Sequence, residues 1–202
     1  VVDNRFVSER VKQLRDWGFD FKQGDILDKE FMCDVLKDAD IVYHFAGITD
    51  VAYTKAEENT QSERITEVGI EGSRIVLDCI PDHCKLMFPS THVVYEGFKE
   101  ARYDVKEDEP TCAELTYATG KVQTEIDLRN SNKNYVILRL ASVYGYSTDT
   151  MRMGIMPNLF SRIASQNGTI KLFSGGVQLK SLVPLIDVAR CFKFMAENNT
   201  IS

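Results

Sequence analysis

The chain has few of the features that mark membrane, metal-binding or nucleic-acid-binding proteins. None of its apolar runs approaches the roughly 20 residues of a membrane span, and its start does not follow a signal-peptide pattern. The five cysteines form no Cys-x-x-Cys pair, and the three histidines have no ligand spacing. The net charge is -6 with no basic stripe. We therefore expect a cytoplasmic protein with reduced thiols, no metal site, and neither nucleic acid nor a membrane as a partner.

What the sequence does contain is a regular alternation of strand-like and helix-like patterns over 202 residues, enough for one full core. We predict strands near residues 1–3, 19–26, 40–46, 85–88, 135–143 and 169–173. We predict helices near residues 8–17, 28–36, 56–80, 116–130, 156–166 and 187–197. The run at 40–46 is almost wholly apolar, as in a buried parallel strand. Strands separated by such helices indicate an α/β fold with a parallel sheet covered on both faces.

Polar and small residues follow several of the predicted strands. They are Asp3, Asp25, Ala46 with Gly47, Thr91, and Ser142. In parallel sheets, ligands bind beyond the carboxyl ends of the strands. The sequence therefore predicts one continuous binding site at that edge.

Tyr117 and Lys121 place a phenol and an ammonium group at positions i and i+4 of a predicted helix. A positive charge beside a phenol lowers its pKa and makes it a usable acid/base. Thr91 would add a hydroxyl group at the end of its strand. The three groups together suit removal of a proton from a sugar or alcohol hydroxyl. A chance pair on a helix surface is the alternative for the Tyr-x-x-x-Lys spacing alone.

The surrounding motifs favour the catalytic interpretation. They are Val-Val-Asp-Asn, Gly-Asp-Ile, His-Phe-Ala-Gly, Ser-Thr-x-x-x-Tyr-x-Gly, Leu-Arg-x-x-Ser-Val-Tyr-Gly and Val-x-Leu-x-Asp-Val-Ala, at 1–4, 24–26, 44–47, 90–97, 138–145 and 183–189. In this order they resemble the NAD-dependent epimerase/dehydratase family of extended short-chain dehydrogenases/reductases, which acts on nucleotide sugars. The resemblance implies a Rossmann-like doubly wound parallel sheet in residues 1–145. Residues 146–202 would hold the start of a small C-terminal substrate lobe, interleaved with the end of the Rossmann-like domain.

The chain departs from the family pattern at several places. The first strand and the Gly-rich loop, which hold the cofactor pyrophosphate, would lie before Val1. We therefore expect a fragment, or joined segments, that binds a dinucleotide poorly by itself. Ser142 replaces the usual Asn, Glu96 is inserted after Tyr95, and Lys180 replaces an Arg.

The resemblance also implies roles for individual residues. The catalytic residues would be Thr91, Tyr117 and Lys121. The cofactor NAD would contact Asp3, Asn4, Asp25, Ile26, Phe45, Ala46, Gly47, Tyr117 and Lys121. Asp3 favours NAD over NADP, since a carboxylate repels a 2'-phosphate, although Arg5 nearby could pair with that phosphate. The substrate would contact Thr91, His92, Ser142 and Lys180, whereas Arg139 would be structural.

We predict a nucleotide-sugar epimerase. His92 and Val93 stand where dehydratases of this family have Asp-Glu, which argues against 4,6-dehydration. The alternatives are an NAD(P)H-dependent reductase or dehydrogenase of a sugar or other carbonyl compound, and a non-catalytic cofactor-binding subunit. The resemblance further implies a homodimer formed through helices 56–80 and 116–130, with Val122, Ile126 and Leu128 available on the second helix.

Overall fold

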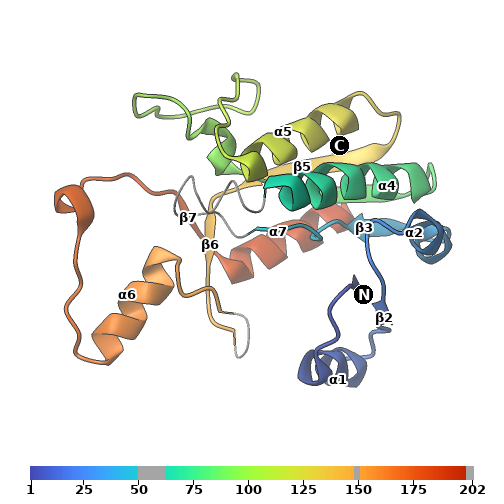
Figure 1. Cartoon of the computed structure of the whole chain (residues 1–202), viewed down its shortest axis with the longest axis horizontal. Coiled ribbons are helices and arrows are strands. Elements are labelled where there is room, and N and C mark those ends of the chain that lie inside the picture. Colours follow the sequence, from blue (N-terminus) through green and yellow to red (C-terminus); the bar gives the residue numbers. More distant parts are fainter. Residues whose placement is uncertain (50–61, 148–150, 199–202) are drawn as a thin grey trace.

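The computed structural model describes residues 1–49, 62–147 and 151–198 (Figure 1). Its strands and helices alternate along the chain, as the sequence predicts. The elements are β1 (Val2–Asp3), α1 (Ser8–Asp16), β2 (Lys22–Gln23), α2 (Lys29–Leu36), β3 (Ile41–Tyr43), the π-helical turn η1 (Glu67–Glu71), α4 (Gly72–Cys79), β4 (Lys85–Thr91), the 3-10 turn η2 (His92–Tyr95), α5 (Thr116–Arg129), β5 (Asn134–Leu140), β6 (Ser142–Tyr144), α6 (Met156–Ser165), the 3-10 turn η3 (Phe173–Gly176), β7 (Leu182–Pro184) and α7 (Leu185–Glu197).

All pairs of strands are parallel, and β4 is the centre of the main sheet. The sheet has the order β3-β4-β5, with β4 and β5 in register from Lys85 opposite Asn134 to Thr91 opposite Leu140. The pairs β1-β2 and β6-β7 form two further sheets. Parallel strands need long crossovers, and the intervening helices supply them.

The two faces of β4 pack against different helices, because successive side chains of a strand point to opposite faces. Leu86 and Phe88 belong to the core cluster that α2 and α4 also enter. Met87 lies in a second cluster with Val188 and Phe192 of α7. Figure 1 shows α4 and α5 on one side of the sheet and α7 on the other. This two-sided cover is the α/β arrangement that the sequence predicts.

A buried lysine connects the start of β4 to the end of α7. Lys85 is 3% exposed, and its Nζ donates hydrogen bonds to the carbonyl oxygens of Met195 and Asn198, at 2.8 and 2.9 Å. The last carbonyl groups of a helix have no partner within the helix. Lys85 therefore satisfies part of the C-terminal end of α7.

Strand β3 differs from the expectation of a buried strand. Ile41 and Tyr43 are 38% and 43% exposed. The reason is that β3 pairs with β4 along one edge, whereas within the described residues no strand pairs with its other edge. The apolar run at 40–46 predicted the strand correctly. The burial of β3, however, depends on which other strands pair with it, and the run does not specify those strands.

The prediction that all thiols are reduced is wrong for two cysteines. Cys33 of α2 and Cys79 of α4 form a disulfide, with their Cα atoms 4.6 Å apart. Helices α2 and α4 pack side by side and bring together two cysteines that are 46 positions apart in sequence. Cys84, Cys112 and Cys191 are free thiols. The pairing is a tertiary effect that the cysteine spacing does not reveal.

Several predicted elements have different limits in the structure. The strand predicted at 19–26 is reduced to β2, and the one at 135–143 divides into β5 and β6. The strand predicted at 169–173 is wrong: η3 begins at Phe173 instead. Of the helix predicted at 56–80, residues 56–61 lie outside the described residues, and the rest is helical through Cys79 with η1 inside it.

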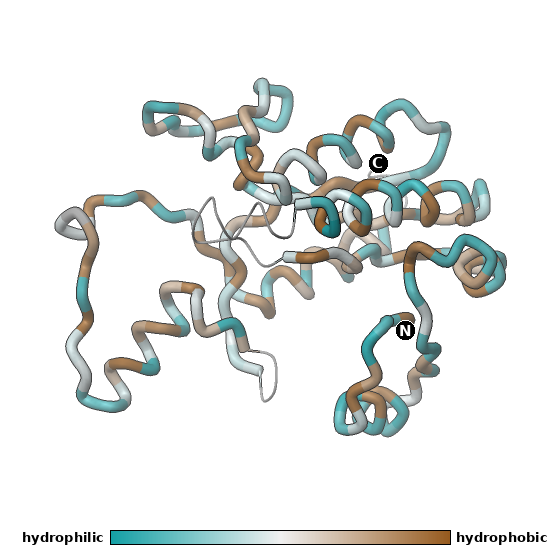
Figure 2. The backbone as a smooth tube through the Cα atoms, viewed as in Figure 1, coloured by the Kyte–Doolittle hydropathy of each residue, from teal (hydrophilic) through white to brown (hydrophobic). Residues whose placement is uncertain are grey.

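Residues 151–180, which we call the outer segment, extend away from the main sheet (Figure 1). Helix α6 has no buried side chain. Phe173, Val177 and Leu179 are also exposed, Phe173 by 85%. Figure 2 shows hydrophobic positions along this stretch of the chain. The division of the chain at residue 145 stays a prediction.

Candidate functional site

Strand β4 delivers Thr91 to the same place as Tyr117 of α5. Thr91 is buried and caps η2, where its Oγ1 accepts a hydrogen bond of 3.2 Å from the backbone N–H of Val93. Its side chain lies close enough to that of Tyr117 to lower the pKa of the phenol, against the larger effect of burial. The sequence therefore places a strand-end hydroxyl against the phenol, as the motif pair predicts.

Lys121 lies one turn beyond Tyr117 on α5, so the two side chains share a face of the helix. Its Nζ is 5.9 Å from the centre of the Tyr117 ring and 4.4 Å from that of Phe88. The second contact is a cation–π interaction with the main sheet. The structure thus brings Thr91, Tyr117 and Lys121 together.

The expected lowering of the Tyr117 pKa is not found. Burial raises the pKa of Tyr117, and the opposing effects of the Thr91 hydrogen bond and the charge of Arg152 do not reverse this. Burial also lowers the pKa of Lys121 to about 8, against the opposing charge of Glu125. The expectation considered the ammonium group alone, whereas removing both groups from water favours their neutral forms.

Two further buried residues at this place were not predicted. His44 Nε2 lies 2.8 Å from Ser73 Oγ, which itself donates a hydrogen bond to the Gly69 carbonyl oxygen. Because the hydroxyl proton of Ser73 is used in this way, His44 donates through Nε2–H. Burial and then the charge of Lys121 lower the pKa of His44 to about 3, so the ring is neutral. Gly69 belongs to the π-helical turn η1, a feature frequent at functional sites.

A narrow cavity lies beside Tyr117 and Lys121. Its lining is formed by Ala46, Gly47, Ile48, Ile65, Gly69, Ser73, Tyr117, Gly120 and Lys121. A Cβ atom at Gly47 or Gly69 would meet no atom within 4 Å, so the backbone is open to close approach at both positions. Open backbone and a nearby ammonium group are the features that the nicotinamide end of a dinucleotide would use, although the cavity itself is small, about 20 Å³.

The residues predicted for the adenosine end lie along β1 and beyond β2. Asp3 and Asn4 are exposed, and the Asp3 carboxylate accepts a hydrogen bond of 2.8 Å from the Arg5 backbone N–H. Asp25 accepts one from the Leu27 N–H at 3.0 Å. The side chain of Ile26 packs in the core instead, against Gly72.

Two of the residues predicted to meet the substrate, His92 and Lys180, lie beside Glu96. His92 Nε2 and Lys180 Nζ lie 3.4 and 3.8 Å from the Glu96 carboxylate. The other ring nitrogen of His92 is bonded to the Leu140 carbonyl oxygen at 3.1 Å. Ser142 begins β6, where its N–H donates to the Ser181 carbonyl oxygen. Glu96, the inserted residue, therefore organises this side of the site.

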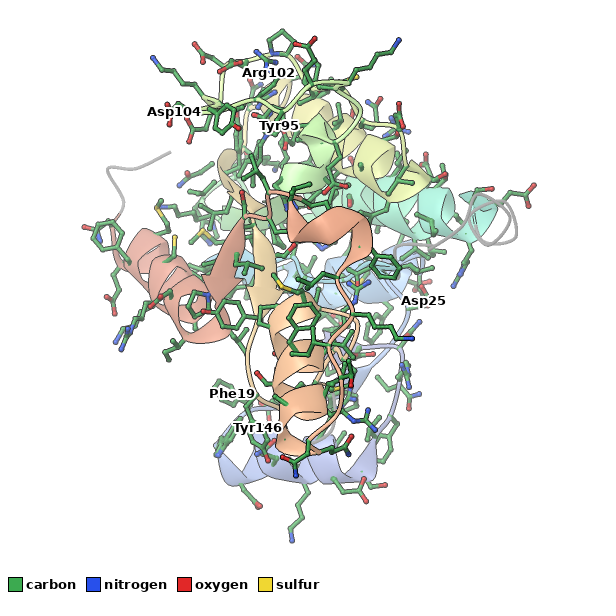
Figure 3. The ribbon with its side chains drawn as sticks, turned by 90° about the vertical axis from the view of Figure 1, so that its left-hand side faces the viewer. Phe19, Asp25, Tyr95, Arg102, Asp104 and Tyr146 are labelled. Carbon is green, nitrogen blue, oxygen red and sulfur yellow. A yellow bond between two sulfur atoms is a disulfide. The ribbon has the colours of Figure 1, made fainter. Side chains whose placement is uncertain are left out.

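The predicted residues extend over a long part of the molecule. Figure 3 shows Asp25 well apart from Tyr95, the last residue of η2, which lies near Arg102 of the following loop. The ring of Phe45 is stacked on Tyr43 and packs edge-on against Phe192 of α7. An extended ligand would be needed to contact all these positions.

The described residues contain neither a helix that could cross a membrane nor a group of three or more His, Cys, Asp or Glu side chains suited to a metal ion.

The parallel sheet with helices on both faces and the Thr91, Tyr117 and Lys121 group define the class to which this chain belongs. It is a member of the NAD dependent epimerase/dehydratase family, whose model matches residues 1–201. NAD is the cofactor of this family.

Solved structures with the same fold include three sugar-nucleotide enzymes. UDP-glucose 4-epimerase of Thermotoga maritima has a TM-score of 0.76 and 24% identity, over 94% of this chain and 62% of that one. UDP-N-acetylglucosamine 4-epimerase of Methanobrevibacter ruminantium has a TM-score of 0.78 and 21% identity, over 98% and 64%. UDP-glucuronic acid 4-epimerase of Bacillus cereus, solved with UDP-glucuronic acid and NAD, has a TM-score of 0.76 and 21% identity, over 98% and 64%. They support the Rossmann-like fold.

Among curated proteins, a "probable low-salt glycan biosynthesis reductase", Agl14 of Haloferax volcanii, is 27% identical over 157 residues. The match covers 75% of this chain and 50% of that protein. The chain therefore spans half the length of this relative and 62–64% of the three solved structures.

Proposed function

We propose that the protein is a nucleotide-sugar epimerase that retains NAD. The observation that carries this proposal is the meeting of the buried Thr91 hydroxyl group, Tyr117 and Lys121, whose Nζ lies 5.9 Å from the centre of the Tyr117 ring, beside the open backbone of Gly47. The three epimerases with the same fold act on UDP-linked sugars, as their names state. The whole protein's substrate is thus proposed to be a sugar nucleotide.

Tyr117 acts as the acid/base in this proposal. Bound NAD supplies a hydride acceptor and donor at the sugar carbon. Burial raises the pKa of Tyr117 and keeps it protonated at rest, so the phenol first releases its own proton to solvent. In this proposal the charge of Lys121 stabilises the phenolate. The phenolate then takes the proton of the reacting hydroxyl group, which Thr91 holds in place. The keto sugar turns in the site and regains hydride on its other face, while Tyr117 returns the proton to the oxygen. The stereocentre is then inverted without net redox change.

The remaining predicted residues bind and orient the ligands. Asp3 would bond to the adenosine ribose and disfavour NADP, and Asp25 would lie beside the adenine. Lys180 and Ser142 would contact the diphosphate or the sugar. Lys supplies charge without the bidentate geometry of Arg.

Dimerisation through α4 and α5 remains a proposal with one correction. Leu128 is 1% exposed and lies in the core, so it is not available to a partner. Ile126 is 42% exposed. The face would therefore use Ile126 and its neighbour Val122.

A reductase is the second candidate, favoured by the curated relative of that name. It would use the same three side chains, with Tyr117 delivering a proton to a carbonyl oxygen. The two functions differ in whether the cofactor is consumed.

The test is to denature the purified full-length protein and identify any released nucleotide by chromatography. Stoichiometric NAD, followed by turnover on a panel of UDP-, GDP- and CDP-sugars without added cofactor, is the expected result. Release of NADP, or turnover only with added NADPH, would replace the epimerase by the reductase. If the protein releases no nucleotide and shows no turnover, the alternative of a non-catalytic cofactor-binding subunit would remain.

A further inference from the structure

Helix α5 carries a third polar side chain, that of Glu125, on the same face as Tyr117 and Lys121. Glu125 follows Lys121 by four residues, so the three side chains lie one turn apart in a single row. Glu125 is 1% exposed, among the most buried large residues of the described chain. A buried carboxylate needs strong partners, and those of Glu125 come from three elements.

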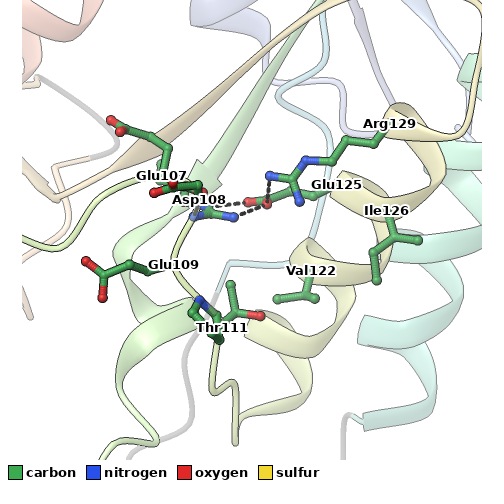
Figure 4. A pocket seen from close by; sticks show the side chains of 10 residues that line it. Glu107, Asp108, Glu109, Thr111, Val122, Glu125, Ile126 and Arg129 are labelled. Carbon is green, nitrogen blue, oxygen red and sulfur yellow. Dashed lines mark hydrogen bonds and ion pairs between the residues drawn. The ribbon is translucent and has the colours of Figure 1, made fainter.

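The first partners are arginines. Arg139 of β5 donates from Nε and Nη2 to the two carboxylate oxygens, at 3.0 and 2.6 Å, and Arg129 of α5 donates from Nη2 at 3.1 Å. Figure 4 shows Glu125 and Arg129 at the wall of a cavity of about 580 Å³, which Arg139 also lines. The Arg139 side chain is 9% exposed, and that of Arg129 is 49% exposed. Only Arg139 is thus an interior counter-charge.

The remaining partner belongs to the strand that carries Thr91. Ser90 Oγ donates a hydrogen bond of 2.5 Å to Glu125 Oε1. Ser90 and Thr91 are neighbours at the end of β4, and Ser90 is itself buried. Glu125 therefore fixes the strand end immediately before the residue that contacts Tyr117.

We propose that Glu125 is a positioning residue, which keeps Lys121 protonated and holds the Thr91 end of β4 against α5. The proposal deepens the proposed function, since it concerns the same site. In this proposal the buried carboxylate of Glu125 supplies the negative charge that stabilises the ammonium group of Lys121.

Within the part of the chain that the structure describes, Glu125 is the carboxylate whose charge acts on Lys121. His44 of β3 is neutral, Phe88 of β4 presents only its ring, and Tyr117 of α5 is protonated in the resting site. Burial lowers the pKa of Lys121 to about 8, and the charge of Glu125 opposes this effect. Without Glu125, the lysine would lose its proton at a lower pH, nearer to the range in which the site must work.

The experiment compares the titration of Lys121 in full-length protein labelled with ¹³C-lysine, wild type and Glu125→Gln. The Lys121 Cε resonance is identified by its loss in Lys121→Arg. We expect Glu125→Gln to move the midpoint to lower pH by about 0.5 unit or more. Asp127→Asn is the matched control, because it removes the same charge from α5 at a residue paired with Arg74 instead. The Asp127→Asn midpoint should move less than half as far.

A second variant covers the case in which Glu125→Gln does not fold. Arg129→Gln removes an exposed cation from Glu125, so the Lys121 midpoint should move to higher pH. An unchanged midpoint in Glu125→Gln, an equal shift in Asp127→Asn, or a downward shift in Arg129→Gln would overturn the proposal. The titration does not depend on turnover, so it distinguishes failure of this inference from failure of the epimerase proposal.

Discussion

The main sheet and the outer segment differ in how far their apolar side chains are buried. In β4 every residue except Pro89 is buried. In residues 151–180, α6 has no buried side chain and Phe173 is 85% exposed. An apolar pattern indicates a surface that can be buried by other elements. Of these two regions, within the described residues, the main sheet is buried in this way and the outer segment is not. The polar groups proposed for catalysis all lie beside the covered strand.

The largest expected effect is on chemistry at the covered strand. Tyr117→Phe should lower turnover of the full-length protein by about 10²–10⁴-fold, since it removes the acid/base. Tyr103→Phe is the control, because Tyr103 is exposed in the loop before α5. Steady-state rates with an accepted sugar nucleotide test this expectation. If the two variants were equally active, Tyr117 would not be the acid/base.

The next effect concerns stability of the buried charges behind that strand. Arg139→Ala should lower the free energy of unfolding by about 3–5 kcal/mol, because the buried Glu125 loses its interior counter-charge. Arg129→Ala, which removes a half-exposed partner of the same carboxylate, should cost about 1 kcal/mol or less. Urea unfolding compares the two. Equal losses would show that burial does not distinguish these arginines.

The disulfide gives a smaller effect at the edge of the main core. Replacing Cys33 and Cys79 together by serine should lower the free energy of unfolding by about 2–4 kcal/mol, since the link closes a long loop of the unfolded chain. Cys112→Ser is the control because Cys112 is a free thiol. Alkylation of the denatured, unreduced protein should modify Cys84, Cys112 and Cys191. Modification of Cys33 and Cys79 as well would contradict the disulfide.

The smallest effect is expected in the outer segment, and one matched pair tests the whole comparison. Phe173→Ala should change the free energy of unfolding by about 0.5 kcal/mol or less. Phe88→Ala, the same substitution at a residue 1% exposed, should cost about 3–5 kcal/mol. Thermal or urea unfolding provides both values. A loss of about 2 kcal/mol or more for Phe173→Ala in the full-length protein would show that Phe173 is covered there.

Much of the fold could be predicted because its signals are local. The periodicity gives the helices and most strands, and the cap residue Asp28 begins α2 as expected, accepting a hydrogen bond from the Phe31 N–H. The meeting of Thr91 with Tyr117 could be predicted because both follow from the position of a strand end and a helical turn. These features depend mainly on residues that are close to one another in the sequence.

The features that sequence reasoning missed depend on distant partners. Exposure of Tyr43 follows from which strands pair with β3, and the link between Cys33 and Cys79 follows from helix packing. The pKa of Tyr117 follows from burial rather than from the lysine alone. Glu125 had a usable signal, its spacing of four from Lys121, but its isolation from water became visible only in the structure.

The bond from Lys85 to the end of α7 has a consequence for synthesis of the chain on the ribosome. Lys85 Nζ donates to carbonyl oxygens 110 and 113 residues later. Until that later stretch emerges, burial of the ammonium group would leave it without acceptors, at a cost of several kcal/mol. We therefore expect β4 to remain partly hydrated until α7 has emerged from the ribosome. Newly made chains should be sensitive to protease up to that point.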